Sequence, residues 1–166
     1  MFNSILLVFS ASVLLYGLID LLQYIYKDRN YVINCNKKKL IEETIFWCMH
    51  NMQKDKNRKP PFFRINYYSS KKYAGHYHVG FRLISIYVIK NSTPHFIVST
   101  VIHEFQHYID LHSRIECENY DRKNIELGYQ NNPYEKRARD AESKYTDLCM
   151  DYLCERKLLV TSSNLS

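Results

Sequence analysis

The sequence predicts an α+β fold, in which a small twisted three-stranded sheet packs on a buried central helix and on further helices. Three observations carry this prediction: a helical apolar pattern across residues 94–111, three short strand patterns directly before it, and a second long helical pattern after Asn132. At 166 residues, the chain has room for one domain with a substantial core and an appended segment. With 46% hydrophobic residues, the composition excludes a disordered chain.

Residues 1–29 are predicted to form an N-terminal anchor helix. Residues 4–26 are the most apolar segment, and a membrane span needs about 20 residues. Because Lys27 and Arg29 follow this segment and no positive charge precedes it, we expect a single-pass membrane protein with a cytoplasmic C-terminal domain. The same lack of positive charge disfavours a secretory signal peptide. A helix that packs on the domain stays open, since Asp20 is costly in lipid.

The cysteines and the charge narrow the functional classes. The five cysteines are odd in number and irregular in spacing, which does not predict a disulfide framework, so we expect reduced thiols. The net charge of +6 is spread over several short basic runs rather than gathered in one arm. Such a distribution is typical of a solvated surface and disfavours a nucleic-acid-binding role.

The domain is predicted to span residues 30–160, followed by a loose tail at 161–166. Residues 30–36 have the pattern of a linker, and Asn36 is the expected N-cap of a helix that ends near Met52. A polar loop with two prolines at its end then covers residues 54–61.

Three strands are predicted next, at Phe62–Tyr68, Tyr73–Tyr77 and Leu83–Ile89. Gly75 and Gly80 punctuate this segment, and a glycine in a strand often marks a bulge or a close backbone approach. His76 and His78 would share one face of their strand. We expect a half-exposed surface there, although a ligand or a substrate-polarising role stays open.

A buried helix is predicted to follow the strands. Ser92 or Thr93 is the expected N-cap, with Pro94 in the first turn. Residues suited to burial recur at helical spacing, and these are Phe96, Ile97, Thr100, Val101, Phe105, Tyr108, Ile109 and Leu111. We expect this helix to lie under the sheet with one polar strip exposed to a cleft.

This helix contains an H-E-x-x-H motif at residues 103–107. Residues four apart lie on one helix face, so His103 and His107 can present two imidazoles to one zinc ion. Glu104 stands beside them as a candidate general base that takes a proton from a metal-activated water. A charged residue in such an apolar run is costly unless it is paired or bound, which favours the metal site over a chance match.

A third metal ligand is expected in the C-terminal half of the chain. Residues 114–131 are predicted to form a polar connection with a helix stop at Gly128, and a long helix starts after Asn132. Glu135 is the favoured ligand, although it could instead complete a capping box with Asn132. Glu142, two turns later on the same face, and His112 are the alternatives. His112 fits only if the motif helix ends at once.

The segments AGHYHVG, LISIYVI, VIHEFQHYID and NPYEKRARDAE together resemble the gluzincin-type minimal zincin metallopeptidases. The ImmA/IrrE-like group is the nearest match, and SprT-like proteases are a more distant one. The resemblance covers about residues 62–145. It implies a zincin-like fold and one catalytic Zn²⁺, with His103, His107 and Glu135 as ligands and Glu104 as catalytic base.

The expected function is therefore that of a zinc metallopeptidase, an endopeptidase that acts on a protein or peptide substrate and is tethered to a membrane. Tyr145, His78 and Tyr134 are candidates to stabilise the oxyanion. A catalytically inactive zincin-like binding domain is the alternative, and the intact Glu104 argues against it. A basic nucleic-acid binder is a third, weaker hypothesis.

Overall fold

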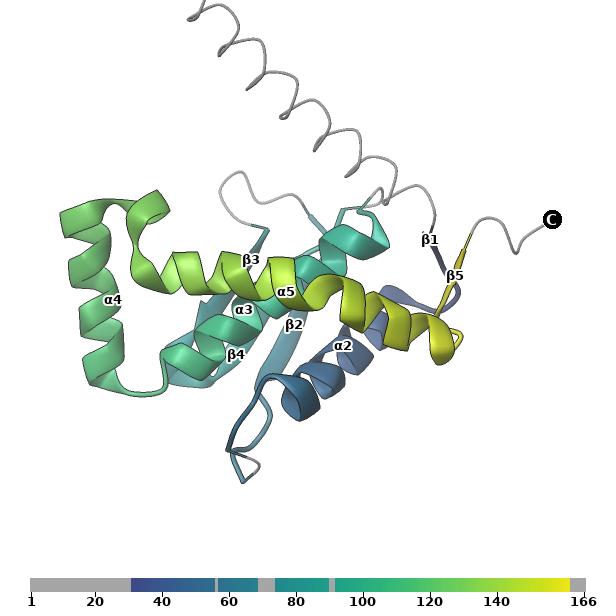
Figure 1. Cartoon of the computed structure of the whole chain (residues 1–166), viewed down its shortest axis with the longest axis horizontal. Helices are drawn as coiled ribbons and strands as arrows, with labels where there is room; N and C mark the ends of the chain where they lie inside the picture. Colours follow the sequence, from purple (N-terminus) through teal and green to yellow (C-terminus); the bar gives the residue numbers. More distant parts are fainter. Residues whose placement is uncertain (1–30, 56, 69–73, 90–91, 162–166) are drawn as a thin grey trace, which may run out of the picture.

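The computed structural model describes residues 31–55, 57–68, 74–89 and 92–161, and these form an α+β fold, as predicted (Figure 1). The helices are α2 (Lys37–Asn51), α3 (Pro94–Asp110), α4 (Arg114–Leu127) and α5 (Pro133–Glu155), with 3₁₀ turns η1 (Val79–Phe81) and η2 (Tyr129–Asn131). The strands are β1 (Tyr31–Ile33), β2 (Phe62–Asn66), β3 (Gly75–His78), β4 (Leu83–Tyr87) and β5 (Leu159–Thr161). The predicted anchor at residues 1–29 lies outside the described residues. Within the described ranges, none of the helices combines the length and the hydropathy that a bilayer crossing requires.

The three predicted strands form one small mixed sheet with the order β2-β4-β3. β2 pairs with β4 in parallel, and β3 pairs with β4 antiparallel, with Gly75 opposite Ile86. The central strand β4 is the most enclosed, since Ile84 and Ile86 have no exposed surface. This arrangement leaves β3 at an edge of the sheet and in contact with α3.

Helix α3 is the centre of the core and packs on α5, α2 and the sheet, as Figure 1 shows. Its start follows the sequence signals, because the Thr93 side chain accepts a hydrogen bond from the Phe96 N–H at 3.2 Å and Pro94 occupies the first turn. Its largest fully buried side chains are Phe105 and Tyr108. A helix enclosed on several sides holds its remaining polar residues in fixed positions.

The ends of the domain are joined by a second, two-stranded sheet, so the prediction of a linker at residues 30–36 was wrong. Tyr31–Ile33 pairs antiparallel with Leu159–Thr161. The Asn34 N–H extends this pairing by a hydrogen bond to the Leu158 carbonyl at 2.9 Å. The predicted cap is present, since the Asn36 side chain accepts a hydrogen bond from the Lys39 N–H at 2.8 Å at the start of α2.

Helix α4 projects from one end of the molecule (Figure 1), and no residue of this helix, which the structure describes in full, is buried. Gly128 ends it with a φ of +74°, a conformation that glycine adopts without strain. The helix therefore corresponds to the predicted polar connection. The cysteines Cys35, Cys48, Cys117, Cys149 and Cys154 are all free thiols, as predicted.

Candidate metal centre

The two histidines of the H-E-x-x-H motif lie one turn apart on α3, and their rings face each other. Their Nε2 atoms are 3.1 Å apart, and the ring planes are nearly perpendicular at 75°. His107 is buried, whereas the side chain of His103 keeps 13% of its surface exposed. Both Nε2 atoms thus converge on one point, as the motif predicts.

Glu135 brings a carboxylate to the same point from the first turn of α5. Its Oε2 atom lies 3.3 Å from Nε2 of His103, and its Oε1 atom lies 3.2 Å from Nε2 of His107. The donor atoms of His103, His107 and Glu135 all lie within 4.8 Å of one another, and Glu135 is only 1% exposed. The three residues favoured as ligands from the sequence are therefore brought together in space.

The donor set fits a zinc ion in both chemistry and spacing. Two imidazole nitrogens and one carboxylate form a common catalytic zinc set, with bonds of about 2.0–2.1 Å. Tetrahedral donors at that bond length are about 3.3–3.4 Å apart. The two Nε2 atoms are 3.1 Å apart, and each lies 3.2 or 3.3 Å from one of the two oxygens of Glu135. The buried Oε2 atom of Glu135 makes no hydrogen bond of good geometry, although Nε2 of His103 lies 3.3 Å away, and a metal ion between the two would satisfy both.

Glu142 contacts His103 from the opposite side of the ring. Its Oε1 atom is hydrogen-bonded to Nδ1 of His103, the nitrogen that points away from the three converging donors. A carboxylate in this position fixes the orientation and tautomer of a metal-binding histidine. The matching Nδ1 atom of His107 is buried and has no such partner. The structure thus places Glu142 outside the donor cluster.

His112 lies outside the donor cluster as well. Helix α3 ends at Asp110, so the chain does turn directly after the motif helix. The new direction leads into α4, whose N-cap is Ser113, and leaves His112 exposed at the surface.

Tyr120 supports the cluster from α4 and could not be recognised from the sequence. Its hydroxyl donates a hydrogen bond to Oε1 of Glu135 at 2.6 Å, and its ring centroid lies 5.8 Å from that of His107. Burial raises the pKa of Tyr120, and the hydrogen bond to Glu135 raises it further. The hydroxyl therefore stays protonated and acts as a donor to the carboxylate.

The electrostatics of the cluster favour a positive charge between the imidazoles and the carboxylates. Burial lowers the pKa of His103, but hydrogen bonds to Glu135 and Glu142 outweigh burial and raise this pKa to about 10. Burial raises the pKa of Glu135, yet hydrogen bonds from His103, His107 and Tyr120 hold it well below its usual range. Glu135 is therefore a carboxylate, the form that binds a cation.

Glu104 lies beside the two histidines, under strand β3. It is 6% exposed, and burial raises the pKa of its carboxyl to about 7, although the nearby His107 and His103 act to lower it. Gly75 of β3 passes so close that a Cβ atom there would lie 2.6 Å from Cγ of Glu104. The backbone of β3 thus approaches the Glu104 side chain closely at Gly75, which is one of the two interpretations predicted for the strand glycines, whereas Gly80 has no atom within 4 Å of an added Cβ.

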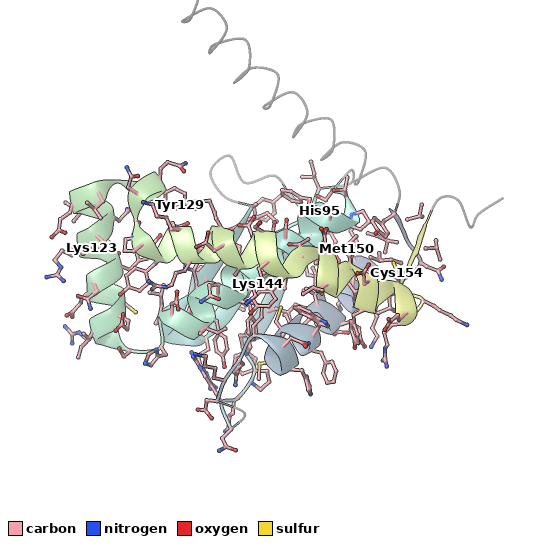
Figure 2. The ribbon with its side chains drawn as sticks, viewed as in Figure 1. His95, Lys123, Tyr129, Lys144, Met150 and Cys154 are labelled. Atoms are coloured by element: carbon pink, nitrogen blue, oxygen red, sulfur yellow. The ribbon has the colours of Figure 1, made fainter. Side chains whose placement is uncertain are left out.

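A cleft of about 990 Å³ opens over His103 and Glu104. Its wall is formed by Gly75 of β3, one face of the start of α3, the end of α4 and one face of α5, and it includes His95, Phe96, Ser99, Thr100, Asn124 and Tyr129. Figure 2 shows Tyr129 near the start of α5 and His95 further along the same side of that helix. The buried cluster is therefore accessible from solvent.

The residues proposed from the sequence to stabilise an oxyanion are occupied elsewhere, and none of the three is among the described residues that line the cleft. Tyr145 packs edge-on against Trp47, the Tyr134 hydroxyl bonds to Glu116, and His78 bonds to Ser85. The strand pair His76 and His78 does share one face, with ring centroids 4.4 Å apart, but it lies outside the donor cluster.

Comparison of the chain with protein-family models, curated proteins and solved structures finds no match.

Proposed function

We propose that this chain is a zinc-dependent metallopeptidase, an endopeptidase with a zincin-type fold similar to the gluzincins of the ImmA/IrrE-like group. The convergence of His103, His107 and Glu135 beneath an open cleft, with Glu104 beside them, is the observation that carries the proposal. Structural zinc sites are closed by four protein ligands, whereas catalytic sites have three and leave one position open. Three donors beneath a cleft that His103 lines match the catalytic type.

Glu104 is the proposed general base. A bound zinc ion would activate water and polarise the scissile carbonyl. The carboxyl of Glu104, with its pKa raised to about 7 by burial, can exchange a proton near neutral pH. It would accept the proton of the attacking water and pass it to the leaving amine. A site that only binds metal would not need this acid in the cleft wall.

Tyr129 is the proposed donor to the oxyanion. Its side chain lines the cleft together with His103 and Glu104. Burial raises the pKa of Tyr129, and a hydrogen bond to Glu135 raises it further, so the hydroxyl keeps its proton. When a substrate is bound, this hydroxyl would turn from Glu135 and donate its one proton to the charge that develops on the carbonyl oxygen.

We also propose that residues 1–29 tether the peptidase to a membrane, with the domain on the cytoplasmic side. The apolar run at residues 4–26 and the positive charges of Lys27 and Arg29 support this. We expect the full chain to sediment with membranes, and removal of residues 1–29 to release it. A full chain that stays in the soluble fraction would contradict the tether without affecting the site.

The decisive experiment measures zinc content and peptide hydrolysis with the full chain in detergent. We expect one zinc per chain in the wild type, loss of zinc in His103→Ala and Glu135→Ala, and retention in Glu142→Ala. Glu104→Gln should keep the zinc and lose hydrolysis of a mixed peptide library. Absence of zinc from folded wild type would refute the metal site. Bound zinc without any hydrolysis would favour an inactive zincin-like binding domain.

A further inference from the structure

One face of α5 contributes a cation to the cleft. Glu135, Arg139 and Glu142 are spaced four and three residues apart and so lie on one helix face, and the last two line the cleft beside Glu104. Neighbours on such a face have Cβ atoms about 5–6 Å apart. Arg139 is thus one helical turn from the proposed metal ligand Glu135.

Arg139 is held in the cleft by a neutral partner. Its Nη2 atom donates a hydrogen bond to the Gln130 carbonyl at 2.6 Å. Within the part of the chain that the structure describes, no carboxylate lies within ion-pair distance of its guanidinium. Since a guanidinium has five N–H donors, most of them remain available to a ligand.

Two other arginines near Arg139 in the chain differ from it, because each has a carboxylate partner. Arg137, two residues earlier on α5, bonds to Asp110 through Nε at 2.9 Å and stacks over the Tyr134 ring at 4.5 Å. Arg156, near the end of α5, lies 3.7 Å from Glu43. Arg139 therefore combines a position in the cleft with a charge that no described carboxylate neutralises.

We infer that Arg139 selects substrates with an aspartate or glutamate side chain one or two residues from the scissile bond. This inference rests on the proposed peptidase function. An extended peptide advances about 3.3 Å per residue, so a side chain one or two positions from the bond at the zinc site reaches a group one helical turn away. The guanidinium of Arg139 can bind a carboxylate of the peptide through two parallel hydrogen bonds. A lysine at the same position of the peptide would instead place two positive charges side by side.

The surrounding charges sharpen this selection. Glu104, Glu142 and Asp147 also line the cleft, so an acidic side chain placed elsewhere would face carboxylates. Among the described residues that line the cleft, Arg139 is the only lysine or arginine, so it is the group expected to attract an acid. The charges in the cleft thus favour binding of an acidic residue at one position of the substrate and disfavour it at the others.

The test uses fluorogenic peptides that differ only in carrying Asp, Asn or Lys at each of the two positions on either side of the cleaved bond. At one position, we expect wild-type kcat/KM to be at least about tenfold higher for Asp than for Asn, because Asn cannot form the charge-assisted hydrogen bonds to Arg139. Arg139→Ala should abolish this preference, and Arg139→Glu should reverse it in favour of Lys. Arg139→Lys should restore part of it.

Lys136→Ala is the matched control, since it removes the same charge from an exposed position of the same helix, outside the cleft. Retention of the Asp preference in Arg139→Ala, or equal wild-type rates for Asp and Asn at every position, would overturn the inference and leave the peptidase proposal intact.

Binding of the same peptides to Glu104→Gln separates the inference from the proposed function. Suppose that the wild type cleaves no peptide, but that Glu104→Gln binds the Asp peptide about tenfold more tightly than the Asn peptide. If the double variant with Arg139→Ala then loses this difference in affinity, the peptidase proposal fails and the acidic preference stands. Equal binding of the three peptides overturns the inference.

Discussion

Replacing Gly75 by alanine adds one methyl group at the contact between β3 and the motif helix. That Cβ atom would lie 2.6 Å from Cγ and 2.8 Å from Oε1 of Glu104, and 2.9 Å from Cγ2 of Thr100. Thr100 cannot move aside easily, because its hydroxyl bonds to the Phe96 carbonyl at 2.7 Å. Either β3 or the Glu104 side chain must therefore move.

The size of this displacement follows from ordinary packing distances. Carbon atoms in contact are about 3.5–4.0 Å apart, so a contact of 2.6 Å requires a shift of about 1 Å. Overpacking of this kind costs about 1–3 kcal/mol of stability. A catalytic group misplaced by about 1 Å can lose about a hundredfold in rate. We expect both effects in Gly75→Ala, with one zinc per chain retained because the three donor residues are untouched.

Thermal unfolding, zinc content and hydrolysis of one peptide measure the three parts of this prediction. At about 2–4 °C per kcal/mol for a chain of this size, Tm should fall by about 2–12 °C. Gly80→Ala is the matched control, because an added Cβ there would have no atom within 4 Å. If Gly75→Ala matches Gly80→Ala in Tm and in rate, the close approach of β3 to Glu104 is refuted.

Three further predictions concern the metal and the salt bridges. Glu142→Gln should weaken zinc binding about 10–100-fold, because Glu142 orients His103, and the stoichiometry at saturating zinc should stay the same. Competition with a chromophoric chelator measures the zinc affinity, and an unchanged affinity would contradict this prediction. Chelation should lower the Tm of the wild type, since zinc at a thousandfold excess over Kd adds about 4 kcal/mol, and an equal drop in His103→Ala would show that the effect is unrelated to the site. Glu43 bonds to Lys39 at 2.8 Å and has a lowered pKa, mainly through that bond, so its stabilisation is present above the unfolded pKa near 4.5 and is lost as the pH falls through the folded pKa. Glu43→Gln should therefore be less stable than wild type at pH 7 and equally stable in acid. Denaturant titrations at both pH values measure this, and a stability difference that persisted in acid would contradict it.

Much of the fold could be predicted because its boundaries are marked by local chemistry. Asn36, Thr93 and Asn132 each cap a helix with their own side chain, and such caps act within three residues. The three strands of the central sheet were placed within two residues of their observed bounds. These signals are local, so they can be read without knowing the fold.

The β1–β5 pair could not be predicted, for a physical reason. Each strand has three residues, too few for an alternating pattern, and the partners are more than 120 residues apart in the chain. Their pairing depends on α2 and α5 bringing the two ends together. The exposed face of α5 is equally a matter of long-range packing: Leu148 is 54% exposed, because α5 packs through the face that includes Met150 and Leu153.

The candidate site shows the same division between local and long-range information. The spacing of His103 and His107 is a property of one helix, so the sequence could predict their convergence. The choice between Glu135 and Glu142 depends on how α5 crosses α3, and both residues share one face of α5. In the structure the two residues contact different nitrogens of His103. Glu135 lies beside Nε2, whereas Glu142 is hydrogen-bonded to Nδ1.

Tyr120, Tyr129 and Arg139 illustrate why the surroundings of a site are harder to predict than its ligands. No motif spacing ties Tyr120 or Tyr129 to Glu135, and their approach depends on the turn at Gly128 that brings the end of α4 back to the start of α5. Arg139 follows Glu135 by one turn, but only the cleft gives its position a meaning. The motif therefore predicts which atoms could hold a metal, whereas the path of the chain between α3 and α5 determines what that metal site could act on.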